Sequence, residues 1–180
     1  MNKEDVCVLP GTIQSAKNYG YDGLDIWMNE KIEKLPDAKI FIGHSLGVNF
    51  ILKSHINSNS KFIFINPLLK KRTFIIHFIN WFRFLIFEGF PIKKAVPAKY
   101  WWHTFKQVLS LLKVDVLGEI KKIPPENITI IRGKNDNYFC DKENIEILKF
   151  NQIKFIQFEA GHDWNETIAK AAKGLINSQY

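Results

Sequence analysis

Short apolar runs alternate with longer amphipathic stretches along most of this chain. Each run stops near Gly, Pro or Asn, which is typical of strands buried on both faces of a sheet. The runs predict strands at residues 6–9, 39–42, 61–65, 128–131 and 153–158. The stretches between them predict helices at about residues 25–35, 46–56, 115–122, 142–149 and 166–177. This alternation predicts one α/β domain over residues 1–180, with about five parallel strands and helices on both faces of the sheet.

Residues 68–114 interrupt the alternation because they contain no convincing strand. Residues 74–92 are almost entirely apolar. The polar residues within this stretch are His77, Asn80, Arg83 and Glu88. On a helix they fall within an arc of ~140°, which leaves an apolar face of ~220°. Trp101 begins a second stretch in which apolar residues recur at i, i+4, i+7 and i+11, as in an amphipathic helix.

We interpret these two helices as a cap, residues 68–114, that lies over a binding site and is apolar on both its inner and outer sides. Two other interpretations stay open: both helices belong to the core, or one lies on a membrane surface. A membrane span would need about 20 predominantly apolar residues with few charges. The stretch has two charges and a Gly-Phe-Pro break at residues 89–91, so we expect no stable insertion and allow peripheral contact.

The overall composition is that of a folded domain, with 46% hydrophobic and 24% charged residues. Cys7 and Cys140 match neither a zinc spacing nor a disulfide framework, so we expect a reducing compartment and no metal. The net charge is +7, but the densest basic run is only Lys70-Lys71-Arg72, and we expect no nucleic-acid partner. The first residues show no secretory signal, which favours the cytoplasm.

The segment Gly43-His44-Ser45-Leu46-Gly47 fits the pattern G-x-S-x-G. A predicted strand precedes it and a predicted helix follows, as in a nucleophile elbow. A serine at such a tight turn has strained backbone angles, and glycines two residues away on each side let the strand and helix approach. Ser45 is therefore the candidate nucleophile. The N–H of Leu46, at the helix N-terminus, points to where an oxyanion would form.

A serine hydroxyl is a poor nucleophile and needs a base. His162 follows the last predicted strand, which places it at the same edge of the sheet as Ser45. His44 adjoins Ser45 but lies on the wrong side of the turn to reach it. The remaining histidines lie within predicted helices, where each is more often an ordinary surface or core residue: His55, His77 and His103. His162 is therefore the candidate base.

The base needs an acid that orients it and stabilises its charged form. Asp136 follows the fourth predicted strand, in a loop that faces the His162 loop. Two other aspartates compete with it. Asp141 has the position of a helix cap, and Asp163 is adjacent to His162, so its side chain would have difficulty reaching the same ring. Asp136 is the candidate acid.

Five segments, taken together over nearly the whole chain, resemble the α/β-hydrolase superfamily, whose serine, acid and histidine follow one another in this order. They are Pro10-Gly11-Thr12, residues 43–47, Asn66-Pro67, residues 133–136 and residues 160–164. More narrowly, the chain is similar to the compact serine hydrolases of the retinoblastoma-binding-protein type. The resemblance implies an oxyanion hole built from the backbone N–H groups of Leu46 and Thr12, with Ile13 as the second choice for the latter. It also implies that the strand after the oxyanion loop is missing or reduced to residues 21–27.

These features predict a serine hydrolase that cleaves a small-molecule carboxylic ester or thioester through an acyl-enzyme, without a metal or organic cofactor. The aromatic cap favours an apolar acyl group, and the candidate pocket residues are Phe78, Trp81, Trp101 and Phe105. Two alternatives remain: a binding protein on a hydrolase scaffold with little turnover, and a lipid-binding protein of a membrane surface. The leaving group and the oligomeric state do not follow from the sequence.

Overall fold

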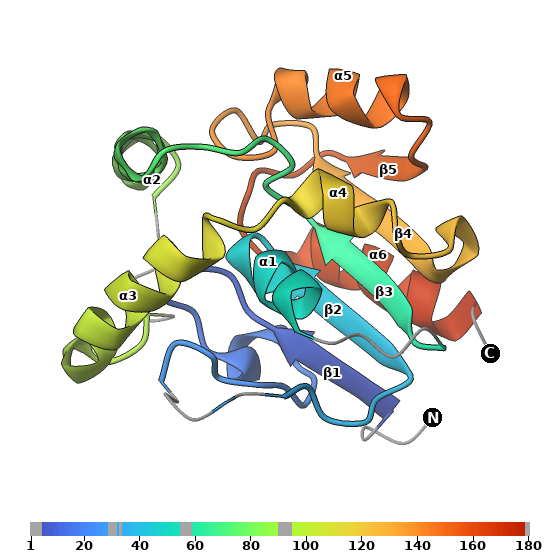
Figure 1. The fold of residues 1–180 in the computed structure, drawn as a ribbon, viewed down its shortest axis with the longest axis horizontal. Coiled ribbons are helices and arrows are strands. Elements are labelled where there is room, and N and C mark those ends of the chain that lie inside the picture. The colour runs from blue at the N-terminus through green and yellow to red at the C-terminus, as the bar shows by residue number, and fades with distance from the viewer. Residues whose placement is uncertain (1–4, 29–31, 33, 55–58, 90–94, 179–180) are drawn as a thin grey trace.

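A computed structural model describes residues 5–28, 32, 34–54, 59–89 and 95–178 of the protein (Figure 1). Its strands are β1 (Val6–Leu9), β2 (Ile40–His44), β3 (Lys61–Ile65), β4 (Ile128–Gly133) and β5 (Phe155–Phe158). They form one sheet in the order β1-β2-β3-β4-β5, and each strand pairs in parallel with the next. The prediction of five parallel strands is confirmed.

Helices cover both faces of this sheet (Figure 1). The α-helices are α1 (Leu46–Lys53), α2 (Phe74–Phe87), α3 (Trp101–Leu111), α4 (Val116–Ile120), α5 (Lys142–Phe150) and α6 (Glu166–Ser178), with short 3₁₀ helices at Ala16–Tyr19, Ala98–Tyr100 and Pro125–Asn127. Because side chains alternate along a strand, Ile40 and Ile42 of β2 pack on the side of α6, and Phe41 packs on the side of α1, α4 and α5. The predicted α/β class with helices on both faces is therefore confirmed.

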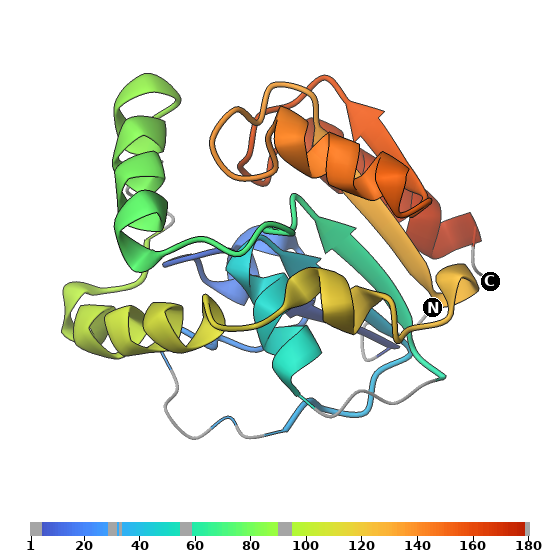
Figure 2. The same cartoon turned by 45° about the horizontal axis from the view of Figure 1, so that its top comes forward.

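The register of the strands brings their carboxyl ends to one edge. Leu9 pairs with Gly43, and Gly133 pairs with Phe158. The loops that leave this edge carry Thr12, Ser45 and the other candidate residues. In Figures 1 and 2, α2 and α3 lie beyond the same edge, on the side toward which the strand arrows point. The fold therefore places the segment predicted as a cap next to the candidate site.

The predicted helix at residues 25–35 is wrong for the residues that the structure describes. Asp25 does not begin a helix; its Oδ1 accepts hydrogen bonds from Ser15 Oγ (2.9 Å) and the Ala16 N–H (2.7 Å). Ile26 and Trp27 follow in a turn and are completely buried. These hydrogen bonds and this burial override the local helical pattern. Residues 29–31 and 33 lie outside the described part of the chain.

The observed bounds of other elements differ from the predicted ones by smaller amounts. The strand implied at residues 21–27 is reduced to a single parallel bridge between Gly23 and Val8 of β1. Helix α1 ends at Lys53, where the hydroxyl and N–H of Ser54 both donate to the Phe50 carbonyl. The predicted ends of this helix and of the first cap helix fall partly on residues 55–58 and 90–94, which are outside the described residues.

Helix α2 turns its polar side toward the body of the protein. His77 is buried beside the ring of Phe139, and Asn80 Nδ2 donates to the Tyr138 carbonyl (3.0 Å). The opposite side of the helix, which includes Ile75 and Phe82, is exposed. This exposure excludes the interpretation of α2 as simply core. Among the described residues, no helix has the length and hydropathy that a crossing of the bilayer requires.

Candidate active site

Ser45 occupies the sharp turn between β2 and α1. Its φ of 51° lies in the left-handed region, which a residue with a side chain adopts at an energetic cost. A Cβ added at Gly43 would come within 3.1 Å of atoms of α1, and one at Gly47 would lie 2.2 Å from the Leu9 carbonyl oxygen. The N–H of Ser45 donates to the Ile65 carbonyl at 2.9 Å. This close junction of strands and helix fixes the serine at the carboxyl edge of the sheet.

The structure brings Ser45, His162 and Asp136 together from three separate loops. His162 Nε2 lies 3.0 Å from Ser45 Oγ, and His162 Nδ1 lies 2.6 Å from Asp136 Oδ2. All three side chains are buried. When Nδ1–H donates to the carboxylate, Nε2 is free of a proton and can accept the serine hydroxyl. The arrangement is suited to removing a proton from Ser45.

The carboxyl group of Asp136 is held in its charged form. Burial alone would raise its pKa, but the facing His162 ring and backbone N–H donors lower the pKa to about 2. Asp136 Oδ1 accepts from the Phe139 N–H (3.0 Å), and Oδ2 accepts from the Cys140 N–H (2.9 Å). These donors fix the carboxylate in the position from which it orients His162.

The two competing aspartates have other partners. Asp141 caps α5 by accepting the Asn144 N–H, and it forms an ion pair with Arg72 at 2.7 Å. Asp163 accepts a hydrogen bond from Gln14 Nε2. Within the described residues, no group of three or more His, Cys, Asp or Glu is arranged to hold a metal ion.

Two residues that sequence reasoning did not assign hold the His162 loop. His44 Nε2 lies 2.8 Å from the His162 carbonyl oxygen, and Asn66 Nδ2 donates to the same oxygen at 2.7 Å. Burial, followed by the neighbouring His162, lowers the pKa of His44 to about 4. The neutral ring must therefore carry its proton on Nε2, because a carbonyl oxygen can only accept. In the sequence, the one indication that Asn66 has a role at the site was its position before Pro67 at the end of β3.

Both predicted oxyanion residues lie close to Ser45. Leu46 is the first residue of α1, so its N–H has no acceptor one turn back within the helix. Thr12 lines a narrow slot of about 20 Å³ together with Ser45 and His162. The next residue, Ile13, has a φ of 56°, which is unusual for a β-branched side chain. The loop after β1 thus carries strain beside the nucleophile.

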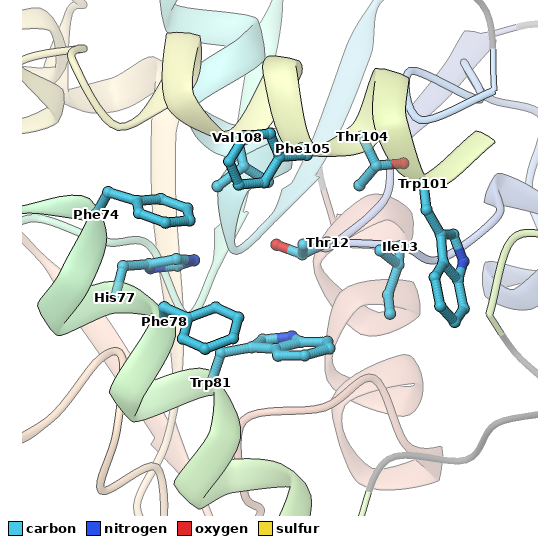
Figure 3. A pocket seen from close by; sticks show the side chains of 10 residues that line it. All are labelled: Thr12, Ile13, Phe74, His77, Phe78, Trp81, Trp101, Thr104, Phe105 and Val108. Atoms are coloured by element: carbon cyan, nitrogen blue, oxygen red, sulfur yellow. The ribbon is translucent and has the colours of Figure 1, made fainter. Parts of the chain in front are cut away.

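A larger apolar cavity of about 190 Å³ adjoins this slot (Figure 3). It lies between α2 and α3, and Thr12 and Trp81 line both spaces. The four predicted pocket residues all line the cavity. The complete lining consists of Thr12, Ile13, Phe74, His77, Phe78, Trp81, Trp101, Thr104, Phe105 and Val108. In Figure 3 the side chains of α2 and α3 face each other across this space.

Two solved structures have similar folds. The thioesterase domain from the curacin biosynthetic pathway is 13% identical, with a TM-score of 0.56 over 98% of this chain and 92% of that chain. The N-formylmaleamic acid deformylase from Pseudomonas putida S16 is 12% identical, with a TM-score of 0.53 over 97% and 91%. No protein-family model and no curated protein matches the sequence. The chain has the α/β-hydrolase fold, and the narrower likeness to the retinoblastoma-binding-protein type stays a prediction.

Proposed function

We propose that this protein is a serine hydrolase that cleaves a carboxylic ester or thioester with an apolar acyl group. The observation that carries the proposal is the hydrogen-bonded series from Ser45 Oγ through His162 to Asp136, with Ser45 in a strained turn. Strain of this kind persists only where neighbouring structure enforces it, and it is concentrated at functional sites.

The proposed reaction proceeds in two halves, each using groups of this chain. Ser45 Oγ attacks the substrate carbonyl carbon while His162 Nε2 takes the hydroxyl proton, and the N–H groups of Leu46 and Thr12 stabilise the oxyanion. The tetrahedral intermediate expels the alcohol or thiol, which receives that proton from His162. Water then attacks the acyl-serine with His162 again as the base, and collapse releases the acid and restores Ser45.

The substrate class is inferred from the cavity. Seven of its ten lining residues are Ile, Val, Phe or Trp, and the cavity meets the slot of Ser45 at Thr12 and Trp81. An acyl chain bound between α2 and α3 would therefore have its carbonyl group near the nucleophile. The names of the two similar structures, a thioesterase and a deformylase, support acyl transfer to water as the reaction class.

A fluorophosphonate probe tests the nucleophile directly. We expect the wild type and His103→Gln to be labelled on Ser45, and Ser45→Ala to remain unlabelled. A panel of activated esters, thioesters and amides then identifies the leaving group. Labelling of Ser45→Ala equal to that of the wild type would contradict the proposal. Absence of labelling in the folded wild type would contradict it too and would favour a binding protein on this scaffold.

A further inference from the structure

The exposed large apolar side chains of this protein are concentrated on α2 and α3. On α2, Ile75, Ile79, Phe82 and Ile86 recur at i, i+4, i+7 and i+11, and between 50% and 69% of each side chain is exposed. We call these four residues the apolar stripe. Elsewhere in the described residues, Phe150 of α5 is the one comparably exposed large apolar side chain. So much apolar surface in one place indicates an interaction site.

The orientation of α2 is inverted with respect to an ordinary surface helix. Its buried residues, His77 and Phe84, lie opposite the apolar stripe. Asn80 also points toward the body and donates to the Tyr138 carbonyl. An amphipathic helix in water normally buries its apolar side. Here His77 and Asn80 of the polar side make internal contacts, and the apolar stripe is exposed.

The apolar surface continues from α2 onto α3. The ring of Phe74 is 5.2 Å from that of Phe105 and 6.0 Å from that of Phe78, and Phe105 stacks on Trp102 at 5.7 Å. Phe78 and Phe105 are exposed and also line the cavity. The mouth of the cavity therefore opens on this surface.

The same part of the chain carries the positive charge of the protein. Residues 68–114 contain nine Lys or Arg and one acidic residue, Glu88, which gives +8. The rest of the chain contains 25 − 9 = 16 basic and 18 − 1 = 17 acidic residues, which gives −1. Lys99 and Lys106 are exposed next to the aromatic rings of Tyr100 and Trp102. Positive charge thus lies beside the exposed aromatic side chains of α3, whereas two other basic residues of the segment, Lys70 and Arg72, form ion pairs with acidic residues outside it.

We propose that the apolar stripe and the aromatic residues of α3 dock the protein on an anionic lipid surface. A lipid interface accepts apolar side chains among the acyl chains and pairs nearby lysines with anionic headgroups. A second copy of this chain would bring its own Lys99 and Lys106 against those of the first, and these like charges would repel. A typical protein interface combines an apolar core with hydrogen bonds at its rim, whereas the apolar stripe has no side chain that forms hydrogen bonds. Docking does not depend on turnover, although it would place the cavity mouth against a source of acyl chains.

Vesicle co-sedimentation tests this proposal on Ser45→Ala, so that the outcome is independent of hydrolysis. We expect binding to vesicles of phosphatidylcholine mixed with phosphatidylglycerol, weaker binding to phosphatidylcholine alone, and loss of the difference at high salt. The double substitution Phe82→Ser with Ile86→Ser should weaken binding by at least about tenfold. Lys99→Gln and Lys106→Gln should each weaken it by about fivefold on the anionic vesicles.

The matched controls are Phe150→Ser and Lys173→Gln, which remove an exposed apolar group and an exposed charge outside the cap. We expect both to bind as the parent does. No binding to anionic vesicles, or equal loss in the cap variants and the controls, would overturn the proposal. Self-association that Phe82→Ser with Ile86→Ser abolishes, without vesicle binding, would also overturn it and would assign the surface to a second copy. Circular dichroism of each variant checks that it is folded before its binding is compared.

Discussion

Ser45 lies in a turn that is so closely packed that neither Gly43 nor Gly47 has room for a side chain. The sequence predicted this turn because glycines at 43 and 47 flank a serine between a strand and a helix. It also predicted His162 and Asp136, because both follow strands that end at the same edge. It could not predict the roles of His44 and Asn66, because each acts on the His162 carbonyl across a separation of 118 and 96 residues, respectively.

Substitution of Gly47 tests the packing of this turn. In Gly47→Ala the new Cβ would lie 2.2 Å from the backbone oxygen of Leu9, so β1 and α1 must move apart. We expect the free energy of unfolding to fall by about 1–3 kcal/mol, as measured by urea denaturation. The control is Gly174→Ala on α6, where no atom of the described residues lies within 4 Å of the added Cβ. It should be neutral or stabilising by up to about 1 kcal/mol; equal effects of the two substitutions would contradict this account.

His77 should make the protein less stable in mild acid. Burial, followed by the charge of Arg72, lowers its pKa from the ordinary 6.5 to about 4, and its Nδ1 has no hydrogen-bond partner in the described structure. Between these values the unfolded chain binds a proton that the folded protein does not, so stability falls as pH decreases from 6.5 to 4. His77→Leu should remove up to about 3 kcal/mol of this loss. Urea unfolding at several pH values from 7 to 4.5 measures the free energy of unfolding of the wild type and of His77→Leu. If this free energy falls equally in both proteins as the pH decreases, the prediction is wrong.

At the scale of elements, apolar periodicity predicted α2 and α3 but not how they are oriented. A periodic pattern defines two sides of a helix, and only tertiary contacts decide which side meets the body. For α2 these contacts are the burial of His77 and the hydrogen bond from Asn80. Tertiary contacts also explain the wrong helix at residues 25–35, where Asp25 accepts hydrogen bonds from Ser15 and Ala16 and does not begin a helix.

The cavity between α2 and α3 should set a preference for acyl-chain length. Each buried methylene contributes up to about 0.8 kcal/mol, or about fourfold in kcat/KM. For p-nitrophenyl esters from acetate to decanoate, below micelle formation, we expect a rise to a medium-chain optimum. Trp81→Ala should lower kcat/KM for the hexanoate by roughly tenfold and change that for the acetate little.

The control for this series is Trp102→Ala, on α3 but outside the lining of the cavity. It should retain the profile of the wild type. Highest activity on the acetate, falling steadily with chain length, would show that the aromatic residues pack against the protein and do not bind the acyl group.

At the scale of the whole molecule, the parallel sheet was predictable because strand–helix alternation is a local pattern and parallel strands require crossover connections. The uneven charge, +8 on residues 68–114 and −1 on the rest, is also present in the sequence. Its significance depends on the structure, which places α2 and α3 of that segment beside the site (Figure 2). Several large apolar side chains of these two helices are exposed. The body positions the proposed catalytic groups, and residues of α2 and α3 line the cavity that we propose binds the substrate.

The central claim is that Ser45, His162 and Asp136 act as one catalytic unit. The most direct measurement is kcat on an activated ester for Ser45→Ala, His162→Ala, the double variant and Asp136→Asn. We predict that each alanine substitution lowers kcat by roughly 10³-fold or more, that the double variant is no worse than the singles, and that Asp136→Asn costs somewhat less. Turnover close to that of the wild type in Ser45→Ala, or additive losses in the double variant, would contradict the account.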